Sequence, residues 1–537
     1  MKKIYILSAV AMLFSLASCG TKSLEVESQT SITTDYLYSS PEGLSRAAVA
    51  LYVKDRSLLR SYEGSKDQVP AGSVMFDYST DIMVFRAGLN ASIARHSGVT
   101  SATSIIGAYW DILYQIVGKA NEVIHYSKVV DPALENSLVR RAYGEASFFR
   151  ARAYFELYKR FENLYLNTIP TTTENMEGRV YRPSSKKEIF AQIKSDLETA
   201  VEYLDWENPK GEPGRLTKAA PYHMRAQLAM WEEDWQGAID NCEAIFTSGY
   251  YSMIDSMTEV FTGADLNHSE SIYVYQFSPN AGGGNTVSNG VPIGHYVNSF
   301  TVARYWRQDG FKECLEYGGK GHGYLYPNTY LLSLYNKEKD NRYKEMFIHE
   351  LKYIDESILP EGASLGDVAD VPASSYIGNG HPYSFKYADK WTNVGIPTQE
   401  SSFRDIIVYR LAETYLMAAE AYFHKEGGAS AKALEYYNKT YARAMGELFT
   451  GTLALEDILE ETARELHLEG VRWNQLKRLG LLAERVKLHG GDSKAEDPKL
   501  DKDYTEPRQN WDDKWWRWPI PQSALDVMPG YPQNTGW

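Results

Sequence analysis

Three stretches of the chain set flat aromatic side chains beside groups that can form hydrogen bonds. The first, residues 75–90, contains Phe76, Tyr78, Asp81, Phe85, Arg86 and Asn90. The second, residues 289–306, contains Asn298, Tyr305 and Trp306, and the third is centred on Trp391. Sugar rings have apolar C–H faces and hydroxyl rims, so aromatic rings beside amides and charged groups suit a carbohydrate site. We predict that these residues contact a sugar ligand, with core packing as the alternative for any single aromatic.

Composition favours binding surfaces. The 537 residues include 40 Tyr and 12 Trp against 18 Phe, and Tyr and Trp suit partly wet surfaces because each has a polar edge. A net charge of −14 argues against nucleic acid as the main partner. Only Cys242 and Cys314 accompany Cys19, so we expect two buried thiols rather than a disulfide framework.

Catalytic and metal-binding motifs are weak. Residues 362–366, Gly-Ala-Ser-Leu-Gly, match the nucleophile elbow, but prolines at 360 and 372 predict a loop instead of the required strand and helix. The 11 histidines are dispersed, and His349-Glu350 has no second histidine one turn later. The acidic turn of Asp501, Asp503 and Glu506 resembles a calcium-loop fragment without its glycine. We therefore predict no catalytic residue, no cofactor and no dedicated metal site.

The N-terminus predicts export. Two lysines precede the apolar run 4–16, whose 13 residues reach about 20 Å as a helix, too short for a bilayer of roughly 30 Å. Leu16-Ala17-Ser18-Cys19 resembles a bacterial lipobox, which predicts a signal peptide over residues 1–18, lipidation of Cys19 and a tether over residues 19–40. The alternative is an ordinary signal with an incidental cysteine.

Helical periodicity dominates the segments that must position the aromatic stretches. Apolar and small residues at three- and four-residue spacing predict paired helices that resemble tetratricopeptide repeats. The expected helices begin at Pro41 and cover 109–124, 139–161, 184–201, 219–231, 235–246, 406–423 and 430–444. Residues 271–277 alternate like a strand, and glycine-rich loops follow. The fold class predicted is mainly α, a helix-pair scaffold with a large loop-rich lobe and a few short strands.

Five motifs in sequence resemble the SusD/RagB family of Bacteroidetes outer-membrane nutrient-binding lipoproteins. They are Arg410-Leu411-Ala412-Glu413, Ala418-Ala419-Glu420-Ala421, Glu465-Leu466-His467-Leu468-Glu469-Gly470-Val471-Arg472-Trp473, Leu476-Lys477-Arg478-Leu479-Gly480, and Pro519-Ile520-Pro521 with Gln533-Asn534-Thr535-Gly536-Trp537. The N-terminal half agrees, and departures such as Asn474-Gln475 fall at positions that are structural in the family. From the residues alone, Glu465, Glu469 and Arg472 are expected to pair along one helix.

The resemblance implies an outer-membrane protein facing the cell exterior. It would capture oligosaccharide and deliver it to a SusC-like TonB-dependent transporter, without catalysis. Residues 41–270 and 271–537 would form the N-terminal SusD-like and C-terminal RagB/SusD-like regions of one compact unit. The alternatives are a RagB-like peptide binder, a surface glycoside hydrolase and a purely structural scaffold.

Overall fold

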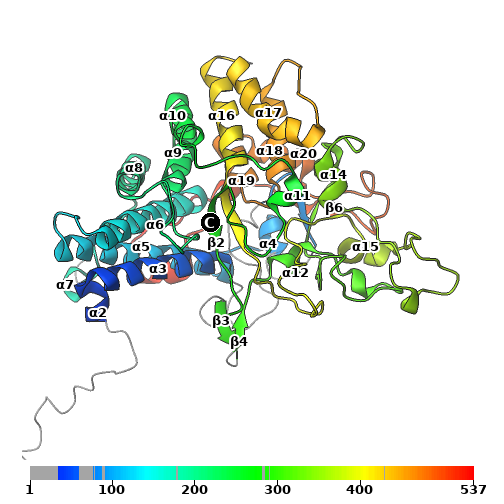
Figure 1. Cartoon of the computed structure of the whole chain (residues 1–537), viewed down its shortest axis with the longest axis horizontal. Coiled ribbons are helices and arrows are strands. Elements are labelled where there is room, and N and C mark those ends of the chain that lie inside the picture. The colour runs from blue at the N-terminus through cyan, green and yellow to red at the C-terminus, as the bar shows by residue number, and fades with distance from the viewer. Residues whose placement is uncertain are drawn as a thin grey trace, which may run out of the picture.

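Long helices packed side by side form one end of the molecule (Figure 1). The computed structural model describes residues 34–59, 77, 79–86, 91–176, 179–280, 285–288, 291–428 and 430–537. The predicted signal peptide and Cys19 lie outside these residues. The long helices are α3 (Pro41–Arg56), α5 (Ser104–Val130), α6 (Ser137–Phe161) and α8 (Lys186–Tyr203), with the short α2 (Thr34–Ser39) and α7 (Thr173–Met176) beside them. The contacts of α6 with α3, α5 and α8 bury its predicted apolar face.

Local sequence explains where these helices begin. Ser185 accepts a hydrogen bond from the Glu188 amide at 3.2 Å, and the Glu188 carboxylate accepts one from the Ser185 amide at 2.7 Å. This reciprocal capping box starts α8. Ser40 likewise caps α3, and Pro41 occupies its first turn, where a missing amide hydrogen is tolerated.

Two helix hairpins from distant parts of the chain pack together. The first is α9 (Ala219–Glu232) with α10 (Trp235–Phe246), and the second is α16 (Leu411–Lys425) with α17 (Ala431–Met445). Helix α10 contacts α16, and alanines of both hairpins lie in shared buried clusters: Ala226, Ala418, Ala419 and Ala433 in one, and Ala229, Ala238 and Ala421 in the other. Ala431, also predicted at a close-contact position, is exposed. The helix-pair scaffold predicted from sequence is therefore confirmed. Helices α18 (Leu455–Leu466), α19 (Arg472–Arg478) and α20 (Leu482–His489) extend it.

The prediction of a helix from residue 406 is wrong at its start. Residues Ile406–Arg410 form strand β8, which pairs antiparallel with β2 (Ser271–Tyr275), and α16 begins only at Leu411. The isoleucines at 406 and 407 favour an extended backbone because their branched side chains pack well on a sheet. The strand predicted around residue 271 is confirmed.

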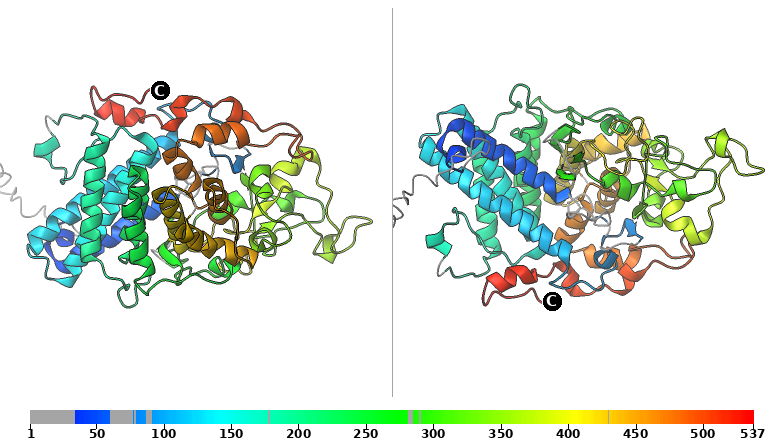
Figure 2. Two further views of the ribbon diagram at one scale, coloured as in Figure 1. Left: turned by 90° about the horizontal axis from the view of Figure 1, so that it is seen from above. Right: turned by 90° about the horizontal axis from the view of Figure 1, so that it is seen from below.

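Loops dominate the opposite end of the molecule in all three views (Figures 1 and 2). Among the described residues, its sheets are two-stranded and antiparallel: β1 (Met83–Phe85) with β5 (Leu325–Pro327), β3 (Asn285–Ser288) with β4 (Val291–Ile293), and β6 (Phe347–Ile348) with β7 (Tyr383–Ser384). Its helices are short: α11 (Met257–Val260), α12 (Val297–Thr301), α13 (Thr329–Ser333), α14 (Asn341–Glu345) and α15 (Ala373–Asn379), with α4 (Ala91–Ala94), α21 (Glu506–Gln509) and α22 (Gln522–Val527) elsewhere. No described helix is both long and apolar enough to cross a bilayer.

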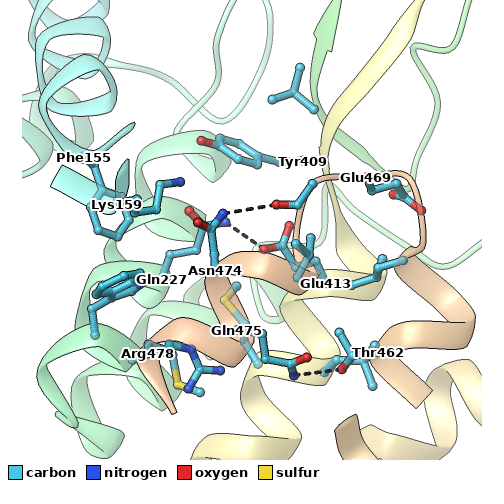
Figure 3. A pocket seen from close by; sticks show the side chains of 18 of the residues that line it. Phe155, Lys159, Gln227, Tyr409, Glu413, Thr462, Glu469, Asn474, Gln475 and Arg478 are labelled. Carbon is cyan, nitrogen blue, oxygen red and sulfur yellow. Dashed lines mark hydrogen bonds between the residues drawn. The ribbon is translucent and has the colours of Figure 1, made fainter. Parts of the chain in front are cut away.

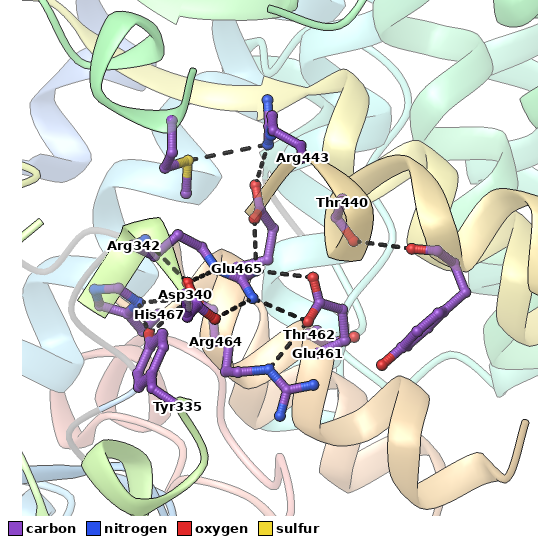
Figure 4. A network of polar contacts seen from close by, with 12 residues as sticks. Tyr335, Asp340, Arg342, Thr440, Arg443, Glu461, Thr462, Arg464, Glu465 and His467 are labelled. Atoms are coloured by element: carbon purple, nitrogen blue, oxygen red, sulfur yellow. Dashed lines mark hydrogen bonds and ion pairs between the residues drawn. The ribbon is translucent and has the colours of Figure 1, made fainter. Parts of the chain in front are cut away.

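A buried ion network joins the loop-rich lobe to the helical scaffold (Figure 4). Glu465 on α18 contacts Arg342 of α14 at 2.9 Å, Arg410 of β8 at 2.7 Å, and Arg443 of α17. The expectation that Glu465, Glu469 and Arg472 pair along one helix is wrong, because α18 ends at Leu466 and Leu468 has a φ of +66°. Their role is structural, as expected, but each charge bonds to a distant element.

Candidate functional site

Strand pairing brings the end of the first aromatic stretch beside the glycine-rich loop. Phe85 on β1 lies opposite Leu325 on β5, and the Arg86 amide donates to the Tyr324 carbonyl at 2.8 Å. The Phe85 and Tyr324 rings are nearly parallel, with centroids 6.2 Å apart. Residues 85–86 and 324–325 therefore lie together at one corner of the loop-rich lobe, although they are about 240 residues apart in sequence.

Glycines allow the loop 318–323 to lie against the end of α12. The Gly323 amide donates to the Val302 carbonyl at 2.8 Å, and the His322 amide donates to Ser299 at 2.7 Å. Gly323 has a φ of +58°, and a Cβ there would lie 2.3 Å from the Gly378 carbonyl oxygen. The close approach of three backbones thus requires glycine at this position.

Basic side chains gather on this corner. Arg86 donates to the Gly323 carbonyl at 3.0 Å and to the His322 carbonyl at 3.1 Å, and its guanidinium lies 5.2 Å from the Tyr324 ring. Arg304 and Arg307 flank Tyr305 and Trp306 at the one-turn helix η4 (Tyr305–Arg307). Burial, and then the charges of Arg86 and Arg307, lower the pKa of Arg304 to about 10. The three guanidinium groups are therefore close enough to repel one another.

Trp306 is fixed among these charges. Its indole N–H donates to the Gly321 carbonyl at 2.9 Å, and its ring centroid lies 5.2 Å from the Arg307 guanidinium carbon and 5.3 Å from the Lys320 ammonium. Lys320 and His322 in turn contact Glu400 at 3.1 and 3.5 Å. We call the set of Arg86, Arg304, Trp306, Arg307, Lys320, His322, Tyr324 and Glu400 the cationic patch; Arg307 is exposed and the others are partly exposed.

A separate pocket lies among the helices, lined by apolar and aromatic side chains and by charged groups that pair with one another (Figure 3). Lys159 contacts Glu156 at 2.7 Å, and Gln227 donates to Glu413 at 2.7 Å. Although burial raises the pKa of Glu156, Lys159 and Arg152 lower it to about 2, the opposite of the shift that a glycosidase acid requires. The pocket has a volume of about 70 Å³, which is enough for only a few water molecules. We assign it no ligand.

Comparison with known proteins identifies the family. Residues 243–537 match the model of the SusD family, and residues 24–230 match a family described as "Starch-binding associating with outer membrane". The chain belongs to the SusD family. This confirms the resemblance drawn from the five sequence motifs and the mainly α fold.

Relatives cover nearly all of this SusD-family chain. It is 24% identical to the SusD-like protein P25 of Formosa agariphila over 97% of its own length and 96% of that protein. A SusD homologue from Bacteroides thetaiotaomicron superposes with a TM-score of 0.74 at 19% identity, covering 94% and 99% of the two chains. Surface glycan-binding protein A from the same organism, solved in complex with laminarihexaose, has a TM-score of 0.70 at 19% identity and covers 92% and 99%.

The structure of this SusD-family member separates the predicted ligand residues into groups. Arg86 and Trp306 lie in the cationic patch, and Phe85 supports it from beneath at 4% exposure. Asp81 and Tyr305 are wholly buried. The Asp81 carboxylate binds Arg472 at 2.6 and 2.9 Å, and the Tyr305 hydroxyl bonds to the Gly319 and Cys314 carbonyls at 2.8 and 2.9 Å. We therefore leave these two out of the proposed ligand contacts.

The remaining predicted residues lie elsewhere or outside the described chain. Asn298 on α12 is buried, and neither of its side-chain amide atoms has a hydrogen-bond partner within the described part of the protein. Trp391 is partly exposed, and the Arg404 guanidinium carbon lies 4.4 Å from the centre of its ring. Phe76, Tyr78 and Asn90 lie outside the described residues.

Apart from Arg86, sequence reasoning missed the basic members of the patch. Arg304 and Arg307 bracket the predicted Tyr305 and Trp306, and Lys320 lies within the glycine-rich loop. The local pattern Arg-Tyr-Trp-Arg at residues 304–307 can thus be read directly from the sequence. However, the convergence of both segments on Arg86 depends on the pairing of β1 with β5, which periodicity does not reveal.

Sequence reasoning also missed a second aromatic surface. A hollow of about 460 Å³ is lined by Trp206 and Tyr250 together with Asn208, Asn267 and Ser269. The plane of Trp206 lies within 6° of that of Tyr250, with ring centroids 6.2 Å apart. We call this the Trp206 hollow, and it is the alternative location for a ligand.

Proposed function

We propose that this protein is a cell-surface lipoprotein that binds oligosaccharide without cleaving it and passes it to a SusC-like TonB-dependent transporter in the outer membrane. In this proposal residues 1–18 are a signal peptide, a lipid that includes palmitate is attached to Cys19, and residues 19–40 form a tether. Residues 41–270 and 271–537 then act as one extracellular unit. The family description and the laminarihexaose complex of a structural relative support this proposal.

One observation carries the proposal for the ligand. Trp306 and Tyr324 are partly exposed aromatic rings in the cationic patch, and backbone hydrogen bonds hold both segments in place. Rigid aromatic rings bind sugar faces with little loss of conformational entropy, and the surrounding charged groups can bond to hydroxyls. The aromatic rings of the pocket in Figure 3, such as those of Phe155 and Tyr409, instead line a cavity of only about 70 Å³.

The test compares two tryptophans that lie in different parts of the molecule. Trp306→Ala is expected to weaken binding of the protein's oligosaccharide by about tenfold, while Trp206→Ala leaves it unchanged. Isothermal titration with plant, mucin and starch oligosaccharides measures both, and circular dichroism confirms that each variant is folded. Phe85→Ala is unsuitable, because Phe85 is buried and its loss would destabilise the lobe.

Each contrary result has a defined meaning. If Trp206→Ala alone weakens binding, the ligand site is the Trp206 hollow rather than the patch. If peptides bind and no oligosaccharide does, the protein is a RagB-like peptide binder. If any oligosaccharide is cleaved at a measurable rate, the non-catalytic proposal fails.

A further inference from the structure

The cationic patch is anomalous in a protein of net charge −14. Five basic side chains from three segments meet there, and Glu400 is the carboxylate that contacts two of them, Lys320 and His322. Within the described residues, no carboxylate lies within ion-pair distance of Arg86, Arg304 or Arg307. By contrast, Arg342 and Arg410 in the buried ion network are each paired with several carboxylates. The patch therefore has an excess of positive charge.

Arg304 shows that this excess is held rigidly. Its backbone amide donates to the Gly378 carbonyl at 2.6 Å, which fixes its position beside Arg86. Its Nε atom is buried without a hydrogen-bond partner among the described residues. The neighbouring charges of Arg86 and Arg307 repel that of Arg304. An anion bound at the surface of the patch would offset this repulsion.

The geometry also restricts what kind of anion fits. A guanidinium group presents parallel donors that match the oxygens of carboxylate or sulfate. The Trp306 ring lies within 5.2 Å of the Arg307 guanidinium carbon, so a ligand can contact an aromatic ring and a cation together. Sugar rings that carry acidic substituents combine these two features in one molecule.

We propose, resting on the oligosaccharide-binding function above, that the cationic patch is selective for acidic oligosaccharides bearing carboxylate or sulfate groups. Arg304 and Arg307 bind the anionic substituents, Arg86 supports the charge from beneath, and Trp306 contacts a sugar ring. Neutral oligosaccharides lack the negative charge that would offset the repulsion among the arginines, so their affinity is lower.

The experiment measures affinities of the full-length protein in detergent by isothermal titration. The probes are oligogalacturonate for carboxylate, carrageenan oligosaccharides for sulfate, and laminarihexaose as the neutral reference. We expect at least one acidic probe to bind about tenfold or more tightly than the neutral one. Its affinity should fall as NaCl is raised from about 50 mM to about 500 mM, because salt screens exposed charges. The two acidic probes distinguish carboxylate from sulfate.

The double variant Arg304→Gln with Arg307→Gln tests the residues. It should weaken the acidic probe by about tenfold or more and any neutral binding by much less, because a guanidinium group bonds more strongly to an anion than to a hydroxyl. Arg182→Gln is the matched control, because the Arg182 side chain is 70% exposed near the start of α8 and should not alter any affinity. Thermal unfolding confirms that the variants are folded.

The outcomes separate this inference from the proposed function. If the neutral probe binds best and Trp306→Ala alone weakens it, the acidic selectivity is wrong while oligosaccharide binding stands. If a polyglutamate peptide binds and no saccharide does, both proposals fail. Equal loss of acidic and neutral binding in the double variant also overturns the selectivity, because it indicates a structural effect.

Discussion

At the scale of single residues, burial sets the properties of several carboxylates. Asp492 lies near the end of α20, where its carboxylate accepts hydrogen bonds from the Thr329 amide at 2.9 Å and hydroxyl at 2.7 Å. Burial, partly offset by these bonds, raises its pKa to about 7. An unfolded aspartate titrates near ~3.9, so the folded protein holds this proton over a wider pH range than the unfolded chain.

The sign of the resulting pH dependence follows directly. Between about pH 4 and about pH 7 the folded state binds more protons at Asp492, so its contribution to stability falls as pH rises. Asp492→Asn keeps both hydrogen bonds and removes the charge. We therefore expect Asp492→Asn to leave the free energy of unfolding almost unchanged at about pH 4. At about pH 8 it should raise the free energy of unfolding by roughly 2–4 kcal/mol. Urea unfolding at several pH values measures this.

The control for this prediction is Asp513→Asn at an exposed position of the same C-terminal region. It should change stability by less than about 0.5 kcal/mol at every pH. A constant effect of Asp492→Asn across the pH range would show that its charge is not the cause.

At the scale of elements, periodicity predicts the helices well and the site poorly. The capping box of Ser185 and the alanines of α9 and α16 are local signals, so sequence analysis places those helices correctly. Residues 406–410 mislead it, because their partner strand β2 lies more than a hundred residues away. Periodicity does not predict the cationic patch either, for the same reason. Trp306 can be selected from the sequence as a candidate. Its position near Arg86, however, depends on the pairing of β1 with β5 and on the glycine contacts of the loop 318–323.

The ion network between α14, β8, α17 and α18 gives a prediction at this scale. Glu465→Gln keeps the side-chain size but leaves Arg342, Arg410 and Arg443 without the charge that they share. Breaking a buried charge network in this way is expected to cost about 3–5 kcal/mol. Chemical denaturation followed by circular dichroism measures the loss.

An exposed pair provides the matched comparison. Lys339 and Glu447 contact each other at 2.7 Å with both side chains 54% exposed. Glu447→Gln should therefore cost less than about 1 kcal/mol. A similar loss of unfolding free energy in Glu465→Gln and Glu447→Gln would show that burial does not make the ion network more important for stability than an exposed pair.

At the scale of the whole molecule, the proposed function makes membrane attachment depend on residue 19 rather than on the folded part. Cys19→Ser is expected to abolish lipidation and to shift the protein from the membrane fraction to the soluble fraction, since several acyl chains are needed for stable anchoring. Labelling with a palmitate analogue and cell fractionation measure this. Unchanged labelling of the variant would contradict the proposed lipid site. Cys242→Ser is the control, because that thiol is buried in the helical core.

The contact between α10 and α16 has a consequence for biogenesis. Residues 235–246 cannot complete their packing until residues 411–425 have been synthesised and brought alongside them. Such distant pairings delay folding. If the chain is exported as proposed, its helical scaffold would stay incompletely packed until most of the chain has been exported, so export and folding need not compete.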